Sequence, residues 1–315
     1  KLKDMTYKEL ALYIMGEFFT DFSKEELKEC IDLAYDNKFE SEEIVPLKKV
    51  GNVFYLELFH GPTLAFKDMA LCLLPHLMKR AAKKQKLNKE IVILTATSGD
   101  TGKAALEGFA NVEGTKIVVF FPEEGVSKIQ KKQMVTQKGE NTKVIGIKGN
   151  FDDAQSEVKK IFNDDKLRKE LDKNSYRFSS ANSINIGRLV PQVVYYFYGY
   201  MKLLKTGEIN FGDKINFSVP TGNFGNILAA YYAKKMGLPI NKLICASNEN
   251  KVLYDFFQSG TYDAEREFIL TISPSMDILI SSNLERLIYD ISGRDSSVVN
   301  KLMTNLNGHN KYTIS

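Results

Sequence analysis

One lysine, Lys67, stands where an extended segment turns into a helix. Residues 54–59 are rich in aromatic side chains and predict a short buried strand, and the Gly-Pro-Thr sequence at 61–63 breaks it. From Asp68 onward the sequence favours a helix, so we expect Lys67 at its start.

That position suggests a chemical use for Lys67. An ammonium group there meets the positive end of the helix dipole, and Phe59, Leu64 and Phe66 are expected to withdraw it from water, so both effects favour the neutral amine. A neutral amine is a nucleophile toward carbonyl compounds, which makes Lys67 the candidate catalytic residue. Taken alone, the stretch also fits a lysine that snorkels at a helix start.

A second candidate is the polar turn at 97–102, which follows the β-branched run at 91–94 and opens a helix. Backbone N–H groups and hydroxyls meet anions in such strand, turn and helix arrangements. The expected guest is a substrate carboxylate, held by Ser98, Asp100 and Thr101. An ordinary capped turn is the alternative.

The third candidate is the stretch 219–226, again a strand, a glycine-bearing loop and a helix. Its glycines allow backbone N–H groups to converge, and the helix adds its positive end, so a phosphate is the natural guest. The spacing matches neither the nucleoside-triphosphate loop nor the dinucleotide fingerprint. The residues expected to hold the phosphate are Gly222, Asn223, Phe224, Gly225 and Asn226.

These stretches have a common setting, because each follows a predicted strand. Ligands of open α/β sheets bind at the carboxyl ends of the strands. An amine, a carboxylate site and a phosphate site at one sheet edge would suit pyridoxal 5′-phosphate holding an amino acid, with Lys67 in the Schiff base.

The remaining pattern predicts the scaffold. Capping boxes at Thr6 and Ser23 indicate helices within residues 1–50. Strands and helices then alternate from 91 to 162 and again from 214 to 246, which is typical of parallel sheets in an α/β protein. A long helix is expected at 186–204.

Composition excludes several classes of protein. The chain has 315 residues and a net charge of +4, too small for a nucleic-acid surface, and no apolar run is long enough for a membrane span. Three cysteines and three histidines lack metal-ligand spacing, so no metal is expected and a reducing cytoplasm fits. The chain opens on Lys1 without a signal-peptide pattern and ends at Ser315 without a closing element, so we expect it to be a piece of a longer protein.

Five motifs, in this order and spacing, resemble the threonine synthase family of the branch found in enterobacteria and yeast. They are FHGPTLAFKD (59–68), ATSGDTG (96–102), NSINIGRLVPQ (182–192), PTGNFGN (220–226) and SPSMDI (273–278). The resemblance implies a pyridoxal-phosphate enzyme of fold type II, similar to the tryptophan synthase β subunit, with two open parallel-rich sheets flanked by helices. It implies a helical lead-in at 1–50, a larger cofactor-binding domain from 51–94 and 191–315, and a smaller α/β domain at 95–190.

The resemblance also implies the reaction. The family converts O-phospho-L-homoserine and water to L-threonine and phosphate by γ-elimination and β-addition of water, the last step of threonine biosynthesis. Lys67 would bind the cofactor and move the protons. The protein would be a cytoplasmic carbon-oxygen lyase acting on phosphates, a monomer or homodimer.

The leaving phosphate requires a second anion pocket. Asn185 and Arg188 stand at the start of the long helix, and the arginine fork suits phosphate. The alternative is that Arg188 pairs with a surface carboxylate. Asp100 replaces the Asn common in related enzymes, so its contact is left open, and no match is found before Ser315 for the family's hydroxyl that faces the pyridine nitrogen.

Two other functions fit the same residues. A phospho-lyase or dehydratase on this fold would release ammonia and a 2-oxo acid. A non-catalytic cofactor carrier or interaction protein would have kept only the fold.

Overall fold

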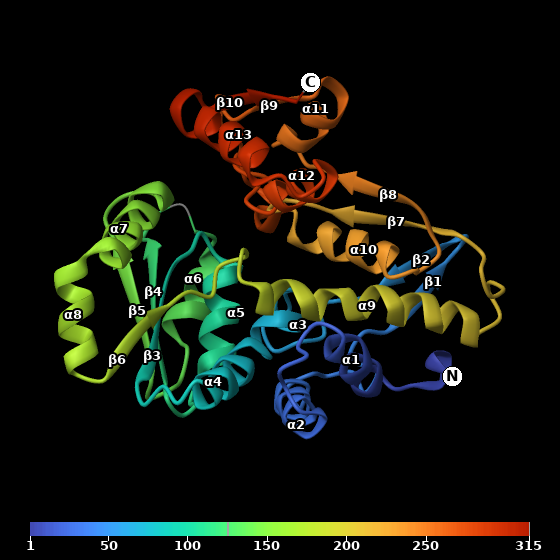
Figure 1. The fold of residues 1–315 in the computed structure, drawn as a ribbon, viewed down its shortest axis with the longest axis horizontal. Coiled ribbons are helices and arrows are strands. Elements are labelled where there is room, and N and C mark those ends of the chain that lie inside the picture. Colours follow the sequence, from blue (N-terminus) through green and yellow to red (C-terminus); the bar gives the residue numbers. More distant parts are fainter. Residues whose placement is uncertain (125, 315) are drawn as a thin grey trace. The chain divides into compact units, whose positions relative to one another are not determined.

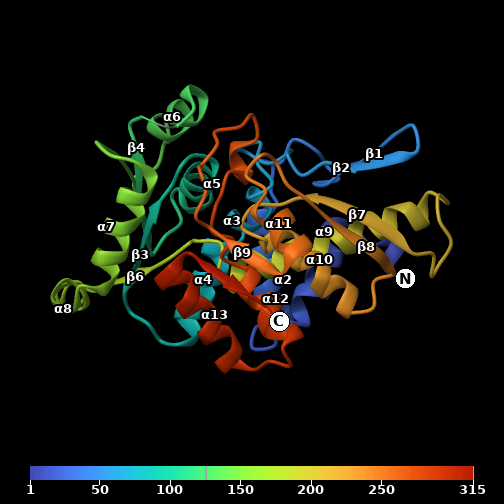
Figure 2. The same cartoon turned by 90° about the horizontal axis from the view of Figure 1, so that it is seen from above.

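The computed structural model describes residues 1–124 and 126–314 and divides into two compact units, Lys1–Thr206 and Gly207–Ser315. Figures 1 and 2 show the elements of both. The three-part division expected from the sequence stays a proposal, and residues 125 and 315, which it includes, lie outside the described residues.

The first unit contains a four-stranded parallel sheet in the order β5-β4-β3-β6. Its strands are β3 (Glu90–Ala96), β4 (Thr115–Pro122), β5 (Thr142–Ile147) and β6 (Tyr176–Ser179). Ile93, Ile117 and Val119 are fully buried, as expected for parallel strands covered on both faces. The strands β3, β4 and β5 agree with the predicted ones.

Helices cover both faces of this sheet. In Figures 1 and 2, α7 (Phe151–Asn163) and α8 (Asp165–Lys173) lie on one side, while α5 (Asp100–Phe109) lies on the other. The helix α6 (Lys128–Val135) packs against α5. Alternation of strand and helix along the chain therefore gives the layered α/β arrangement that the sequence predicts.

The same unit holds the helical lead-in, which consists of η1 (Leu2–Asp4), α1 (Tyr7–Gly16) and α2 (Lys24–Ala34). Both predicted capping boxes form, with Thr6 and Ser23 as the N-caps. The long helix α9 (Ile186–Lys205) packs against α1, and its tyrosines are buried.

The strand predicted at 54–59 is shorter and less buried than expected. β1 (Leu47–Val50) and β2 (Val53–Leu56) form an antiparallel hairpin outside the parallel sheet. Val53 and Tyr55 are more than half exposed, because the hairpin packs only its other face, where Leu56 approaches Gly199 of α9. Ten residues separate the end of β2 from Lys67, so the expectation that Lys67 follows a strand of the parallel sheet is wrong.

Lys67 is the N-cap of α3 (Asp68–Leu71), a single buried turn that precedes α4 (Leu74–Lys84). α3 packs against α5 and α9. The approach to α5 is close, since a Cβ atom added at Gly108 would lie 2.1 Å from the carbonyl oxygen of Leu71. Glycine at 108 therefore sets how near the lysine-bearing turn comes to α5.

The second unit has a two-stranded parallel sheet and a separate antiparallel pair of short strands. The parallel sheet is β7 (Ile215–Pro220) with β8 (Ile240–Ala246), and the second pair is antiparallel, β9 (Thr261–Asp263) with β10 (Lys311–Thr313). The helices are α10 (Gly225–Lys235), α11 (Val252–Ser259), η2 (Pro274–Met276), α12 (Leu284–Ile291) and α13 (Ser296–His309).

The fold class expected from the sequence is thus confirmed: an α/β protein with open parallel sheets flanked by helices. Among the described helices, none combines the length and the apolar character that crossing a membrane requires.

Candidate active site

The side chain of Lys67 is buried, with only 8% of the residue exposed, so it does not snorkel to the surface. Its Nζ atom lies 5.8 Å from the centre of the Phe66 ring, as expected. Phe59 and Leu64, however, are about half and two-thirds exposed and do not wall the amine in. The turn α3 is also too short for the helix dipole to contribute as predicted.

Asp100 is the direct partner of Lys67, with 2.7 Å between Nζ and Oδ1. The contact that the sequence left open for Asp100 is therefore the candidate nucleophile itself. Burial lowers the pKa of Lys67 from its ordinary value, and the charge and hydrogen bond of Asp100 oppose this shift. The nearby Arg188 lowers the pKa of Lys67 again by like-charge repulsion.

Arg188 is buried on α9, in the same part of the first unit, with 6% of the residue exposed. Its Nη1 donates to the carbonyl of Ala181 at 3.0 Å, while its Nε has no hydrogen-bond partner among the described residues. Burial lowers the pKa of Arg188 to about 10, against the opposing charge of Asp100. The alternative of a surface ion pair is wrong, since this buried guanidinium keeps a donor for an anion.

Asp68, next to the lysine, organises the preceding turn. Its carboxylate accepts hydrogen bonds from the backbone N and the hydroxyl of Thr63 at 2.8 and 2.5 Å. The carboxylate is fully buried, and burial raises the pKa of Asp68 to about 6. Gly61 lies against it, because an added Cβ there would be 2.6 Å from Oδ2. The sequence reasoning missed this role, which the conformation around Lys67 depends on.

In the turn after β3, Thr97 is the residue that the sequence reasoning missed. It is buried, and its Oγ1 accepts from the backbone N of Gly99 at 3.0 Å and of Gly102 at 2.9 Å. Two amides of the expected anion loop are thus already satisfied, by Thr97 and not by Asp100 or Thr101, the caps of the capped-turn alternative. Ser98 is exposed and Thr101 is half-buried, and both stay proposed substrate ligands.

Asn185 caps α9. Its side-chain oxygen accepts from the backbone N of Gly187 at 2.9 Å, and its Nδ2 donates to the carbonyl of Ser180 at 3.1 Å. The amide therefore fixes the start of the helix that carries Arg188, and a contact to substrate is a separate proposal.

The predicted phosphate loop lies in the second unit, between β7 and α10. Phe224 is the N-cap of α10 with a φ of 68°, a left-handed conformation that is rare for a bulky residue, and no side chain caps this helix. A Cβ atom at Gly222 would lie 3.1 Å from the Cα of Met276, which explains the glycine. Asn226 donates from Nδ2 to the carbonyl of Pro220 at 2.7 Å and so ties the helix start to the end of the strand.

The loop's carbonyl groups are held by a segment 59 to 60 positions further along the chain. Ser281 Oγ donates to the carbonyl of Gly222 at 2.7 Å. The backbone N and the Nδ2 of Asn283 both donate to the carbonyl of Asn223, each at 3.1 Å. Ser281 and Asn283 are buried, and no sequence pattern predicts their role beyond their position shortly after the SPSMDI motif.

These residues fit an aldehyde cofactor that carries a phosphate. The first unit supplies a buried amine of lowered pKa next to a guanidinium with a donor to spare. The second unit supplies a glycine-bearing loop at the start of an 11-residue helix that lacks a side-chain cap. The expectation of one common sheet edge is wrong, because β2, β3 and β7, which precede the three stretches, belong to three different sheets. The functional link between the two units is a proposal.

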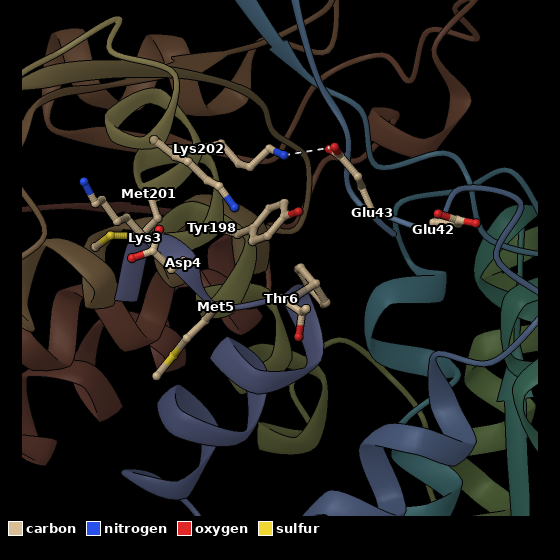
Figure 3. A pocket seen from close by; sticks show the side chains of 11 residues that line it. Lys3, Asp4, Met5, Thr6, Glu42, Glu43, Tyr198, Met201 and Lys202 are labelled. Atoms are coloured by element: carbon tan, nitrogen blue, oxygen red, sulfur yellow. Dashed lines mark hydrogen bonds and ion pairs between the residues drawn. The ribbon is translucent and has the colours of Figure 1, made fainter. Parts of the chain in front are cut away.

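A separate cavity of about 240 Å³ lies in the first unit, near the end of η1, the start of α1 and the last turns of α9 (Figure 3). Lys3, Tyr198 and Lys202 contribute to its lining, and Lys202 forms an ion pair with Glu43 at 2.9 Å. None of the residues predicted to bind cofactor or substrate lines this cavity.

Known relatives share both sequence and structure with this chain. The chain is 44% identical to "Threonine synthase-like 1" of Homo sapiens, over 98% of this chain and 42% of the relative. It is 40% identical to "Threonine synthase" of Pseudomonas aeruginosa, over 98% of this chain and 64% of the relative. The chain thus spans less than two thirds of the length of these relatives.

The structure agrees with the sequence matches. A crystal structure of threonine synthase from Brucella melitensis with bound pyridoxal phosphate superposes with a TM-score of 0.89 at 41% identity, covering 99% of this chain and 65% of that one. These matches confirm the resemblance to threonine synthase and the type II fold. The model of the family "Pyridoxal-phosphate dependent enzyme" matches residues 40–301. The chain therefore belongs to the family of pyridoxal-phosphate-dependent enzymes.

Proposed function

We propose that this chain carries the threonine synthase reaction, converting O-phospho-L-homoserine and water to L-threonine and phosphate. The observation that supports it most is the cluster of Lys67, Asp100 and Arg188 in the first unit. The cluster combines a buried amine, which suits the aldehyde of the cofactor, with a buried guanidinium whose Nε has no hydrogen-bond partner among the described residues. That guanidinium suits the phosphate of the substrate.

In this proposal each side chain has a defined task. Pyridoxal phosphate, when bound, supplies the electron sink for carbanion chemistry. Lys67 binds it covalently through Nζ and afterwards carries protons between the α- and β-carbons of the substrate on the same atom. Residues Gly222 to Asn226 hold the cofactor phosphate through backbone N–H groups.

The proposed substrate contacts lie in the first unit. Arg188 binds the phosphate that leaves, aided by the start of α9 with Asn185 as its cap. Ser98 and Thr101 bind the carboxylate of the substrate through their hydroxyls. Asp100 holds the ammonium form of Lys67 in place before the reaction, because its Oδ1 accepts a hydrogen bond from Lys67 Nζ at 2.7 Å.

The wider context of the reaction is also a proposal. The reaction would be the last step of threonine biosynthesis in the cytoplasm, performed by a monomer or homodimer without metal. Light scattering behind a size-exclusion column measures the oligomeric state.

One other activity stays an alternative, because several relatives with 44 to 45% identity are named "Threonine synthase-like 1" and not threonine synthase. A phospho-lyase that releases phosphate, ammonia and a 2-oxo acid would use Lys67 and both anion sites in the same way. The two activities differ in whether water adds to the β-carbon before the product leaves.

Product analysis separates them. The purified chain with pyridoxal phosphate is incubated with O-phosphohomoserine, and threonine, 2-oxobutyrate and phosphate are quantified together. We expect threonine and phosphate in equal amounts, and no turnover by Lys67→Ala. Exclusive formation of 2-oxobutyrate would replace the threonine synthase proposal by the phospho-lyase. Equal turnover by Lys67→Ala and the parent chain would remove both.

A further inference from the structure

We infer that Ser281 and Asn283 are positioning residues, which aim the amide N–H groups of the 222–225 loop at the cofactor phosphate. The inference rests on the proposed function, since it assigns the phosphate to this loop. It concerns residues that do not touch the phosphate themselves and that act through the peptide groups they hold.

The orientation follows from covalent geometry. In a trans peptide the C=O of one residue and the N–H of the next point in opposite directions, and no cis peptide occurs among the described residues. Ser281 holds the carbonyl of Gly222, and Asn283 holds the carbonyl of Asn223. The N–H groups of Asn223 and Phe224 therefore point away from the segment 281–283.

The alternative orientation would destroy the site. If either peptide rotated, a carbonyl oxygen would face the phosphate, and its partial negative charge would repel the anion. Rotation is a real option for a loop that contains glycine. Phe224, moreover, sits at a φ of 68°, a conformation that persists only where its surroundings impose it.

The positioning residues are themselves rigidly held. Asn283 is fully buried, and its Oδ1 accepts from Nη1 of Arg286 at 2.7 Å. The backbone N of Ser281 donates to the hydroxyl of Tyr262 at 2.7 Å, and that hydroxyl donates to the carbonyl of Leu279 at 2.9 Å. The tie between loop and segment is thus anchored on β9.

A second network fixes the segment just before Ser281. Asp277 is buried, and its Oδ1 accepts from Asn248 Nδ2 at 2.7 Å and from Asn250 Nδ2 at 3.0 Å. The hydroxyl of Thr271 adds a third bond to the same oxygen at 2.8 Å. This network holds the turn that brings Met276 against Gly222. The loop is therefore supported along its length by one continuous segment.

The test compares two forms of the cofactor. Pyridoxal lacks the phosphate but keeps the aldehyde, so it reports on Lys67 without the loop. The variants are Ser281→Ala, which removes the donor to Gly222, and Asn283→Asp, which keeps the shape and the acceptor for Arg286 but loses the Nδ2 donor to Asn223. Ser259→Ala is the matched control, because Ser259 Oγ also donates to a backbone carbonyl, that of Asp255 at 2.8 Å, at the exposed end of α11.

Dissociation constants of both cofactor forms are measured on the chain freed of cofactor, together with the ³¹P chemical shift of bound pyridoxal phosphate. We expect each variant to bind pyridoxal phosphate about tenfold more weakly, the loss of roughly one hydrogen bond, while pyridoxal affinity stays within about twofold. The ³¹P shift should move in both variants, and Ser259→Ala should match the parent chain.

One result would overturn the inference: a ratio of the two affinities that is unchanged in both variants, whether both affinities keep the parent values or fall by the same factor. Failure of the proposed function has a different signature: the parent chain itself would bind pyridoxal as tightly as pyridoxal phosphate, or would form no borohydride-fixed product.

Discussion

At the scale of single residues, two opposing effects decide the protonation of Lys67. Burial favours the neutral amine, whereas the carboxylate of Asp100 at 2.7 Å favours the ammonium. The neutral amine is the form that reacts with an aldehyde. Asp100 therefore lowers the fraction of neutral amine at Lys67 while it fixes the position of Nζ, and the pH dependence of the amine's reactivity measures this effect.

The first prediction concerns the pH at which Lys67 captures pyridoxal phosphate. The pKa of Lys67 lies below its ordinary value, so the capture rate should rise with pH and reach half its maximum below pH 10.5. Asp100→Asn removes the charge that raises this pKa, so the midpoint should move further down. Stopped-flow absorbance of the cofactor across a pH series measures it.

Asp290→Asn serves as the control for this series. Asp290 also pairs with a lysine, Lys235, at 2.6 Å, but in the second unit and outside the predicted site. Its substitution should leave the midpoint where the parent chain has it. A midpoint in Asp100→Asn that is unchanged or higher would show that Asp100 does not stabilise the ammonium.

The second prediction concerns Arg188. Arg188→Lys keeps the positive charge but loses Nε and the planar fork, so one charge-assisted bond to phosphate disappears. We expect KM for O-phosphohomoserine to rise by about 10- to 100-fold, with cofactor content unchanged. Steady-state kinetics with the exposed Arg168→Lys as control measure it. An unchanged KM would place the substrate phosphate elsewhere.

At the scale of elements, the position of α3 depends on close contact with α5. Gly108 leaves no room for a side chain, because Leu71's carbonyl oxygen would lie 2.1 Å from an added Cβ. A backbone atom cannot yield as a flexible side chain can, so α3 or α5 would have to move. Lys67 stands at the start of α3 and would move with it.

The third prediction follows from this contact. Gly108→Ala should lower the free energy of unfolding by at least about 2 kcal/mol through overpacking. Gly308→Ala is the matched control, since Gly308 also lies near the end of a helix, α13, with no atom within 4 Å of an added Cβ. It should stabilise the chain by about 0.5–1 kcal/mol. Urea unfolding measures both, and equal effects would contradict the close approach.

The same scale shows what sequence patterns could predict. A long apolar pattern predicted α9, and the continuous β-branched run at 91–94 predicted β3. They missed β6, a strand of four residues, and α8, which buries none of its side chains and so has no apolar core face to detect.

The candidate site was predictable only in part. Lys67, Arg188 and the 220–226 loop carry local signals, namely a helix start or glycines after a strand. Other hydrogen bonds of the site join residues 33 to 60 positions apart in the sequence, namely those of Asp100, Ser281 and Asn283. Hydrogen bonds between such distant positions leave no local pattern in the sequence. Phe59 and Leu64 were wrong as walls of the site because apolar type does not fix which way a turn points its side chains.

At the scale of the whole molecule, the proposed function divides its parts between two compact units. The loop from Gly222 to Asn226 belongs to the second unit, Gly207–Ser315. The first unit, Lys1–Thr206, contains the other proposed site residues: Lys67, Ser98, Asp100, Thr101, Asn185 and Arg188. A ligand that binds both units should stabilise both.

The fourth prediction uses hydrogen exchange to test this. Pyridoxal phosphate should slow amide exchange in peptides around Lys67 and, separately, in peptides covering 222–226, because bound ligand suppresses local opening. Mass spectrometry of the digested chain measures it, with peptides of α8 as the control that should not change. Protection confined to peptides of the first unit would contradict the proposal that the loop at 222–226 binds the cofactor phosphate.

One measurement tests most directly whether Lys67 is the nucleophile that binds the cofactor. The chain is incubated with pyridoxal phosphate, reduced with borohydride, digested and mapped by mass spectrometry. We predict a single pyridoxyl label on the peptide that contains Lys67, with the label and the visible absorbance band both absent in Lys67→Ala. A label on another lysine, or none on a correctly folded chain, would contradict the assignment of Lys67 as the nucleophile.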